Sequence, residues 1–114
     1  MNLSMSDRML KIDELVRERL GRIIAREVEL PIGALATIVK VATAPNLKET
    51  KVFVSVLPVA KSEVVIKVLN RERANLQHWL GRQIKIRQTP ILKFFVDDTA
   101  EQAAAIDQLL DNLK

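Results

Sequence analysis

The chain has 114 residues, a length that fits one domain. Apolar residues make up 48% of it and charged residues 28%, which is ordinary for a globular protein and excludes a disordered or collagen-like chain. It has no cysteine and only one histidine, His78, so disulfides, thiolate zinc sites, cysteine nucleophiles and sites with two imidazoles are excluded. Charged residues near the N-terminus interrupt any signal-peptide core, and no apolar run reaches the ~18 residues of a membrane span. We therefore expect a cytoplasmic protein.

Positive charge is concentrated in the second half of the chain. The net charge is +4, but residues 61–96 hold eight Lys and Arg against two Glu, which is net +6. Residues 97–114 hold one Lys against five acidic residues, which is net −4. A basic segment of this kind favours a polyanionic partner, and the commonest polyanion of a cytoplasm is RNA.

Residues 7–29 are predicted to form the first helix. Apolar residues recur there at steps of three and four, with Ser6 as a candidate N-cap and Pro31 just after the end. A basic stripe follows one edge of the apolar face at the same spacing, formed by Arg8, Lys11, Arg19, Arg22 and Arg26. Such a stripe is either the solvated side of a surface helix or an edge that faces a polyanion, and the sequence leaves both interpretations open.

Two alternating, β-branched segments, 35–43 and 50–57, are joined by a short turn and predict an antiparallel hairpin. In the first segment the alternation places on one side Leu35, Thr37, Val39 and Val41. In the second it places Val52, Val54 and Val56 on one side, and Lys51, Phe53 and Ser55 on the other.

Residues 62–69 and 71–80 are predicted to form two successive helices. Ser62 is the expected cap of the first, and Gly81 the expected end of the second. Trp79 falls in the apolar stripe and is expected in the core, whereas His78 is expected as a surface polar residue.

The segment after these helices is predicted to be extended, with a strand over 83–88, an interruption at Thr89 and Pro90, and a continuation over 92–96. The inward side chains of the first part are Ile84 and Ile86, and the outward ones are Lys85 and Arg87. A last helix is predicted after Asp98, with a buried face formed by Ala103, Ile106, Leu109, Leu110 and Leu113.

The order of elements is thus α-β-β-α-α-β-α, which predicts an α+β, two-layer domain with a three-stranded sheet and helices on one face. This is the arrangement of a type II KH domain, without the G-x-x-G loop, because none of Gly21, Gly33 and Gly81 lies between the paired helices. One domain is expected over 1–114, with 1–5 as a flexible start.

Catalytic motifs are absent: the chain has no P-loop, G-x-G-x-x-G, H-E-x-x-H or G-x-S-x-G pattern. The adjacent carboxylates Asp97 and Asp98 sit where helix capping explains them. We expect no enzyme, no metal and no cofactor. With 4% aromatic residues and no tyrosine, a base-stacking platform is not expected either.

Two stretches of the chain carry a recognisable pattern. The later stretch is Leu-Gly-Arg-Gln-Ile-Lys-Ile-Arg at 80–87 followed by Pro-Ile-Leu-Lys-Phe-Phe-Val-Asp at 90–97, and the earlier is Lys-Val-Phe-Val-Ser at 51–55 with Asn46 and Leu47 before it. With these stretches the chain resembles the ribosome-binding factor A family of bacteria, and the resemblance covers nearly its whole length. The resemblance implies a non-enzymatic assembly factor that binds the 16S rRNA of the small (30S) subunit. It implies a role in late maturation and 5′-end processing, important at low temperature. The family's Ala-x-Gly kink between the paired helices falls here on Glu72, Arg73 and Ala74.

Electrostatic docking on folded RNA is the mechanism that fits these observations, because basic side chains replace counterions at phosphates. We expect the contacts to be made by Arg8, Lys11, Arg71, Arg73, Arg82, Lys85 and Arg87. The expected partners are the small subunit and 16S rRNA, with no membrane, no small-molecule substrate and a monomer when free. The alternatives are a basic protein-interaction module, or a generic RNA-binding domain without ribosome specificity.

Overall fold

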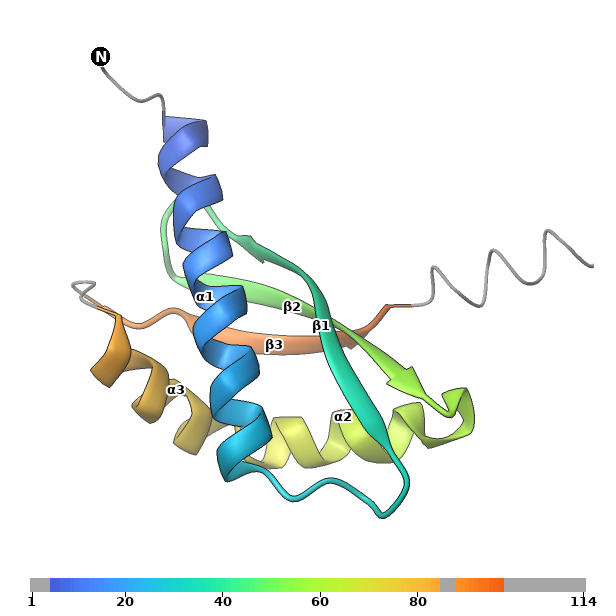
Figure 1. Ribbon diagram of the computed structural model, residues 1–114. Helices are drawn as coiled ribbons and strands as arrows, with labels where there is room; N and C mark the ends of the chain where they lie inside the picture. Colours follow the sequence, from blue (N-terminus) through green and yellow to red (C-terminus); the bar gives the residue numbers. More distant parts are fainter. Residues whose placement is uncertain (1–4, 85–87, 98–114) are drawn as a thin grey trace, which may run out of the picture.

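The computed structural model describes residues 5–84 and 88–97, with side chains from residue 8 onward. Its elements are α1 (Met5–Glu27), β1 (Leu35–Thr43), β2 (Glu49–Leu57), a 3-10 turn (Val59–Lys61), α2 (Ser62–Arg71), α3 (Arg73–Gln83) and β3 (Ile91–Val96) (Figure 1). Within these ranges, no helix combines the length and the hydropathy that a membrane crossing needs. The predicted last helix lies outside the described residues, as do Lys85 and Arg87.

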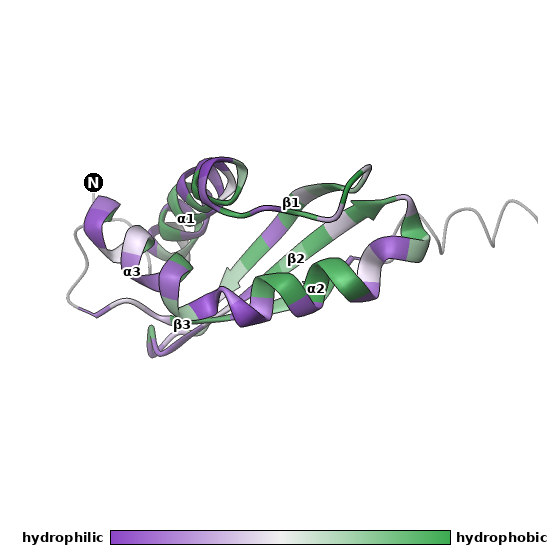
Figure 2. Cartoon of the chain, turned by 90° about the horizontal axis from the view of Figure 1, so that it is seen from below, coloured by the Kyte–Doolittle hydropathy of each residue, from purple (hydrophilic) through white to green (hydrophobic). Residues whose placement is uncertain are grey.

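The sheet has the order β1-β2-β3, with β1 and β2 antiparallel and β2 and β3 parallel. Val52, Val54 and Val56 of β2 share one side of the strand, as predicted, and are buried in a core cluster that also contains side chains of all three helices. Hydrophobic residues follow β2 and the middle of α2, whereas α3 is largely hydrophilic outside its buried Leu76 and Leu80 (Figure 2). The α+β fold with helices on one face of a three-stranded sheet is therefore confirmed.

The side chains of β1 do not keep one alternation along the strand. The pairing with β2 shifts between Ile38 and Lys40, so Val39 has no partner and forms a β-bulge. Because an inserted residue reverses the alternation, Leu35 and Val39 are exposed at 61% and 48% while Val41 is buried. The prediction that these residues share one side with Val41 was wrong for this reason.

The first helix is tied to the far end of the hairpin by hydrogen bonds. Asp13 of α1 accepts a hydrogen bond from the backbone N–H of Thr43 at 3.0 Å. The hydroxyl of Thr43 is 3.0 Å from that of Thr50, and both side chains are buried. These contacts satisfy polar groups at the sheet end that would otherwise be buried without partners.

The paired helices meet at a single non-helical residue. Glu72, with φ −87° and ψ 4°, separates α2 from α3. Arg71 is therefore the last residue of α2, not the first residue of the next helix. The break falls on the first of the three positions where the family resemblance placed a kink.

The third strand begins later than predicted. Gln83 is the last residue of α3, and the N–H of Ile84 still bonds to the carbonyl of Leu80 at 2.9 Å. The strand starts at Ile91, directly after the buried Pro90. The alternating residues after Gly81 were predicted to start the strand, although the first of them end α3. Local alternation does not locate the start of β3, because this strand is defined by its pairing with β2, which is far away in the chain.

Gly81 was predicted to end the second helix, and this prediction was wrong. The residue lies inside α3, which ends at Gln83. A Cβ atom built there would be 2.6 Å from the side-chain oxygen of Thr89, so the glycine lets the loop before β3 approach the helix closely. Gly21 lies inside α1, and a Cβ there would meet nothing within 4 Å. The two helical glycines therefore have opposite roles.

We expect Gly21→Ala to raise the free energy of unfolding by about 0.5–1 kcal/mol, because alanine restricts the unfolded chain and favours the helix. Gly81→Ala should lower it by about 1–2 kcal/mol, because Thr89 must move. Urea unfolding of the two variants beside the parent chain measures both effects. Equal stabilisation by both substitutions would contradict the close approach at Thr89.

Candidate nucleic-acid interface

An aromatic side chain flanked by two cations joins α1 and α3. The guanidinium carbons of Arg26 and Arg82 lie 6.0 Å and 5.8 Å from the centre of the Trp79 ring. Trp79 was predicted to be a core residue, and it is partly buried against the core cluster. His78 lies edge-on to it at 5.7 Å and is exposed, as expected of a surface residue. Cations over an indole are held in place while their polar edges stay in solvent, which suits contact with phosphate.

The basic stripe of α1 is largely compensated in its middle. Arg22 pairs with Glu18 at 3.0 Å, and Arg26 pairs with Glu27 at 2.8 Å. Arg19 is half-buried, and its Nε has no hydrogen-bond acceptor among the described residues. The stripe is therefore partly a network of local ion pairs and partly packing.

Arg17, on another side of the same helix, donates a hydrogen bond to Glu14 at 2.8 Å. This bond and the attraction between the charges hold the pKa of the Glu14 carboxyl below its usual range. The pair thus persists at neutral pH, although both side chains are exposed and salt screens their attraction.

The two predicted contact residues at the helix break differ in availability. The side chain of Arg71 is 71% exposed, and its Nε lies 3.8 Å from Oε1 of Glu72. It lines a hollow of about 510 Å³ together with the loop after α1. Arg73 donates a hydrogen bond to Asn70 at 3.0 Å, and its Nε is buried without an acceptor among the described residues. Arg71 is available to a ligand, whereas Arg73 is part of the packing at the break.

Arg8 and Lys11 are exposed in the first half of α1, and neither has a described carboxylate within ion-pair distance. With a rise of about 1.5 Å per residue, Lys11 lies about 22 Å along the helix from Arg26. The predicted residues therefore occupy separate places: the start of α1, the Trp79 cluster with Arg82, and the helix break.

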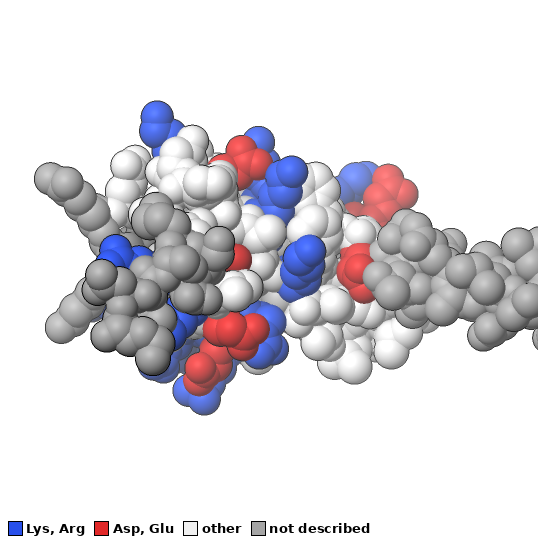
Figure 3. Space-filling model, turned by 90° about the horizontal axis from the view of Figure 1, so that it is seen from above, with Lys and Arg blue, Asp and Glu red and all other residues white. Residues whose placement is uncertain are grey.

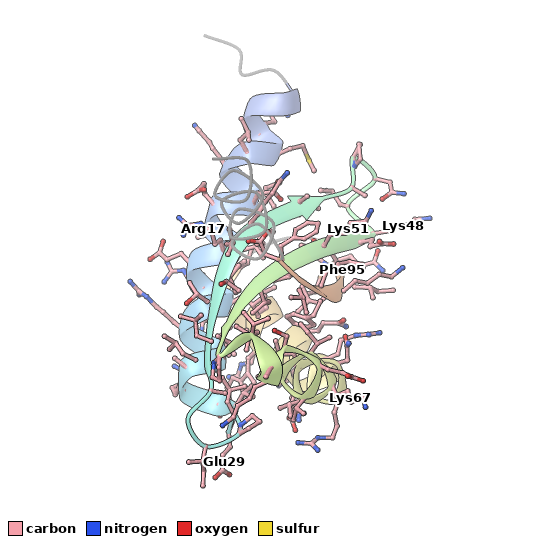
Figure 4. All side chains as sticks on the ribbon, turned by 90° about the vertical axis from the view of Figure 1, so that its right-hand side faces the viewer. Arg17, Glu29, Lys48, Lys51, Lys67 and Phe95 are labelled. Atoms are coloured by element: carbon pink, nitrogen blue, oxygen red, sulfur yellow. The ribbon has the colours of Figure 1, made fainter. Side chains whose placement is uncertain are left out.

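Sequence reasoning missed a further set of cations on the hairpin. Lys40, Lys48 and Lys51 are exposed, and none has a described acidic partner within ion-pair distance. Lys51 and Phe95 lie on strands and Lys48 in the turn before β2, and all three are away from the helix that carries Arg17 (Figure 4). The alternation of Lys51 with Phe53 is the sequence signal for this face, although the net charge is higher in the later segment, residues 61–96.

Seen from above, the described surface carries Lys and Arg in several groups with Asp and Glu among them, and no single uniform patch (Figure 3). Among the described residues, no group of three or more His, Cys, Asp or Glu side chains is placed to hold a metal ion. On the face that Figure 3 shows, the described cations are distributed among several groups.

Comparison with known proteins places the chain in a family. The family model described as ribosome-binding factor A matches residues 8–110. The chain belongs to the ribosome-binding factor A family. The ribosome-binding factor A of Akkermansia muciniphila is 34% identical over 109 residues, which are 96% of this chain and 86% of that protein. That of Phenylobacterium zucineum is 37% identical over 112 residues, which are 96% of this chain and 77% of that protein.

Solved structures of ribosome-binding factor A share the fold. The crystal structure of the protein from Thermus thermophilus superposes with a TM-score of 0.68 at 20% identity, covering 77% of this chain and 93% of that one. A homology model of the Thermus thermophilus factor, fitted into a cryo-EM map of its complex with 30S, gives a TM-score of 0.63 at 20% identity, covering 76% and 92%. The likeness extends over most of each structure.

Proposed function

We propose that this chain is a non-enzymatic assembly factor of the small ribosomal subunit that binds 16S rRNA. Membership of the ribosome-binding factor A family carries this proposal, because the match covers nearly the whole chain. A structural relative that was fitted into a map of a 30S complex supports the small subunit as the partner. A role in late maturation and 5′-end processing in the cytoplasm, with most effect at low temperature, completes the proposal.

The contacts that we propose are those predicted from the sequence: Arg8, Lys11, Arg71, Arg73, Arg82, Lys85 and Arg87. Their separation along the molecule favours docking on the backbone of a folded RNA, where phosphates lie far apart on one surface. Arg82 is the strongest of them, since its guanidinium lies 5.8 Å from the centre of the Trp79 ring, which also has Arg26 within 6.0 Å. Arg73 contributes by fixing the helix break that presents Arg71.

Gradient co-sedimentation of the purified chain with small subunits, large subunits and free RNA tests the proposal. We expect binding to small subunits alone, and a steep loss of binding as the salt concentration rises, because displaced counterions supply much of the affinity. Equal binding to every RNA would reduce the function to that of a generic basic domain. No binding at any salt concentration would contradict the proposal and favour a protein partner.

A further inference from the structure

The face of the sheet opposite the helices carries two aromatic rings, and none of the described helices or strands covers it (Figure 1). The rings of Phe53 on β2 and Phe95 on β3 are roughly parallel, with 5.7 Å between their centres and 28° between their planes. Phe95 is 41% exposed, and Phe53 is half-buried beside it. Because β3 is the edge strand of the described sheet, no strand covers the outer side of Phe95.

Lysines surround this pair of rings in the register of the sheet. Lys40 is opposite Phe53 on β1, and Lys51 precedes Phe53 by two residues on the same face. Lys93 is opposite Lys51 and precedes Phe95 by two residues. Residues two apart on a strand lie about 7 Å from each other, so each ring has a cation one nucleotide's length away.

The charges of this group are only partly compensated. Lys93 pairs with Glu49 at 3.1 Å, whereas neither Lys40 nor Lys51 has a described acidic partner. Lys51 also lines a shallow hollow of about 220 Å³ at the turn end of the hairpin. The open face thus combines flat apolar rings with lysines, two of which have no acidic partner among the described residues.

We propose that this open face, defined by Phe53, Phe95, Lys40 and Lys51, is a second RNA site that binds an unpaired strand. A base would stack on the outer side of Phe95 and continue the ring pair, while Lys51 and Lys40 would contact the neighbouring phosphates. Base stacking on exposed aromatic rings and lysine contacts to the backbone are the two elements of single-strand binding. The inference rests on the proposed function, since it supposes that RNA is the ligand.

An RNA strand fits these observations better than an acidic protein segment. A protein partner would use the lysines and the aliphatic side chains Leu35 and Leu57, which are 61% and 56% exposed, but would not need parallel aromatic rings. The rings are the feature that a base recognises by its flat face. The expectation that no stacking platform exists overlooked this pair, which long-range pairing of β2 with β3 assembles.

Binding of a 5′-fluorescein decauridylate to the full chain, followed by anisotropy, tests the inference. We expect Phe95→Leu, which keeps the apolar volume but removes the ring, to weaken binding about tenfold. Lys51→Ala should weaken binding and reduce the slope of log affinity against log salt by about 0.7. Lys67→Ala is the matched control: Lys67 is an exposed lysine on α2 whose loss should change neither quantity (Figure 4).

Circular dichroism of each variant establishes that the fold is kept. Unchanged affinity in Phe95→Leu would overturn the inference, as would failure of the parent chain to bind decauridylate. Binding of poly-glutamate as tight as that of decauridylate would also overturn it, because an acidic protein would then be the better ligand. Small-subunit co-sedimentation of Phe95→Leu separates the two proposals: retained binding there leaves the proposed function intact even if the open face binds no RNA.

Discussion

Reversing both charges beside Trp79, with Arg26→Glu and Arg82→Glu together, should weaken binding to the small subunit about hundredfold at physiological salt. Arg82 is one of the proposed phosphate contacts and Arg26 lies on the same Trp79 ring, so each substitution is expected to replace a cation with a carboxylate that RNA repels. The slope of log affinity against log salt should fall by about two, one for each lost phosphate contact. Co-sedimentation or filter binding over a range of salt concentrations measures both quantities.

The matched control is Arg17→Glu with Lys67→Glu, which changes the net charge by the same amount at other places. Arg17 and Lys67 are exposed and already paired with Glu14 and Glu63. If the control loses as much affinity as the Trp79 variant, net charge alone governs binding and the cluster has no special role. Both variants should fold, because loss of a cation from an exposed ring costs about 1 kcal/mol or less.

Truncation of the core leucine of α1, Leu20→Ala, should lower the free energy of unfolding by about 3–5 kcal/mol. Leu20 is fully buried where α1 packs on the sheet and α3, so its removal leaves a cavity among rigid neighbours. Small domains are stable by only about 5–15 kcal/mol, so this one change removes a large share of that total. Urea unfolding, followed by circular dichroism, measures it.

Leu10→Ala in the same helix is the control for that measurement. Leu10 is 63% exposed, and its truncation should change the free energy of unfolding by about 0.5 kcal/mol or less. Similar losses in the two variants would contradict burial of Leu20 as the cause of the effect, because alanine is itself a better helix former than leucine. We expect subunit binding by Leu10→Ala to equal that of the parent chain.

Most of the fold could be predicted because its signals are local. The apolar spacing of α1 and the valine alternation of β2 follow from short windows of sequence. The cap of α2 was predicted wrongly: Ser62 is the first residue of the helix, Lys61 holds the N-cap position, and no side chain there makes a capping hydrogen bond. The other exceptions depend on residues far apart. The bulge at Val39 is defined by register against β2, and the start of β3 at Ile91 by pairing with Glu49.

The candidate site was less predictable because charge in a sequence does not reveal which cations are already paired. Arg73 is basic in sequence, yet in the structure it is occupied by Asn70. Lys51 lies in a segment of lower net charge, yet no described carboxylate compensates it. The approach of both Arg26 and Arg82 to the ring of Trp79 required the packing of α1 on α3, which no local pattern contains.

The position of β2 at the centre of the sheet has a consequence for folding during synthesis. Its antiparallel partner β1 precedes it directly, but its parallel partner β3 follows only after two helices. The hairpin can therefore close early, whereas the third strand joins through contacts that are distant in sequence and slow to form. One edge of β2 therefore stays unpaired during synthesis until residues 91–96 have emerged from the ribosome. The sheet of this chain is complete only after that point.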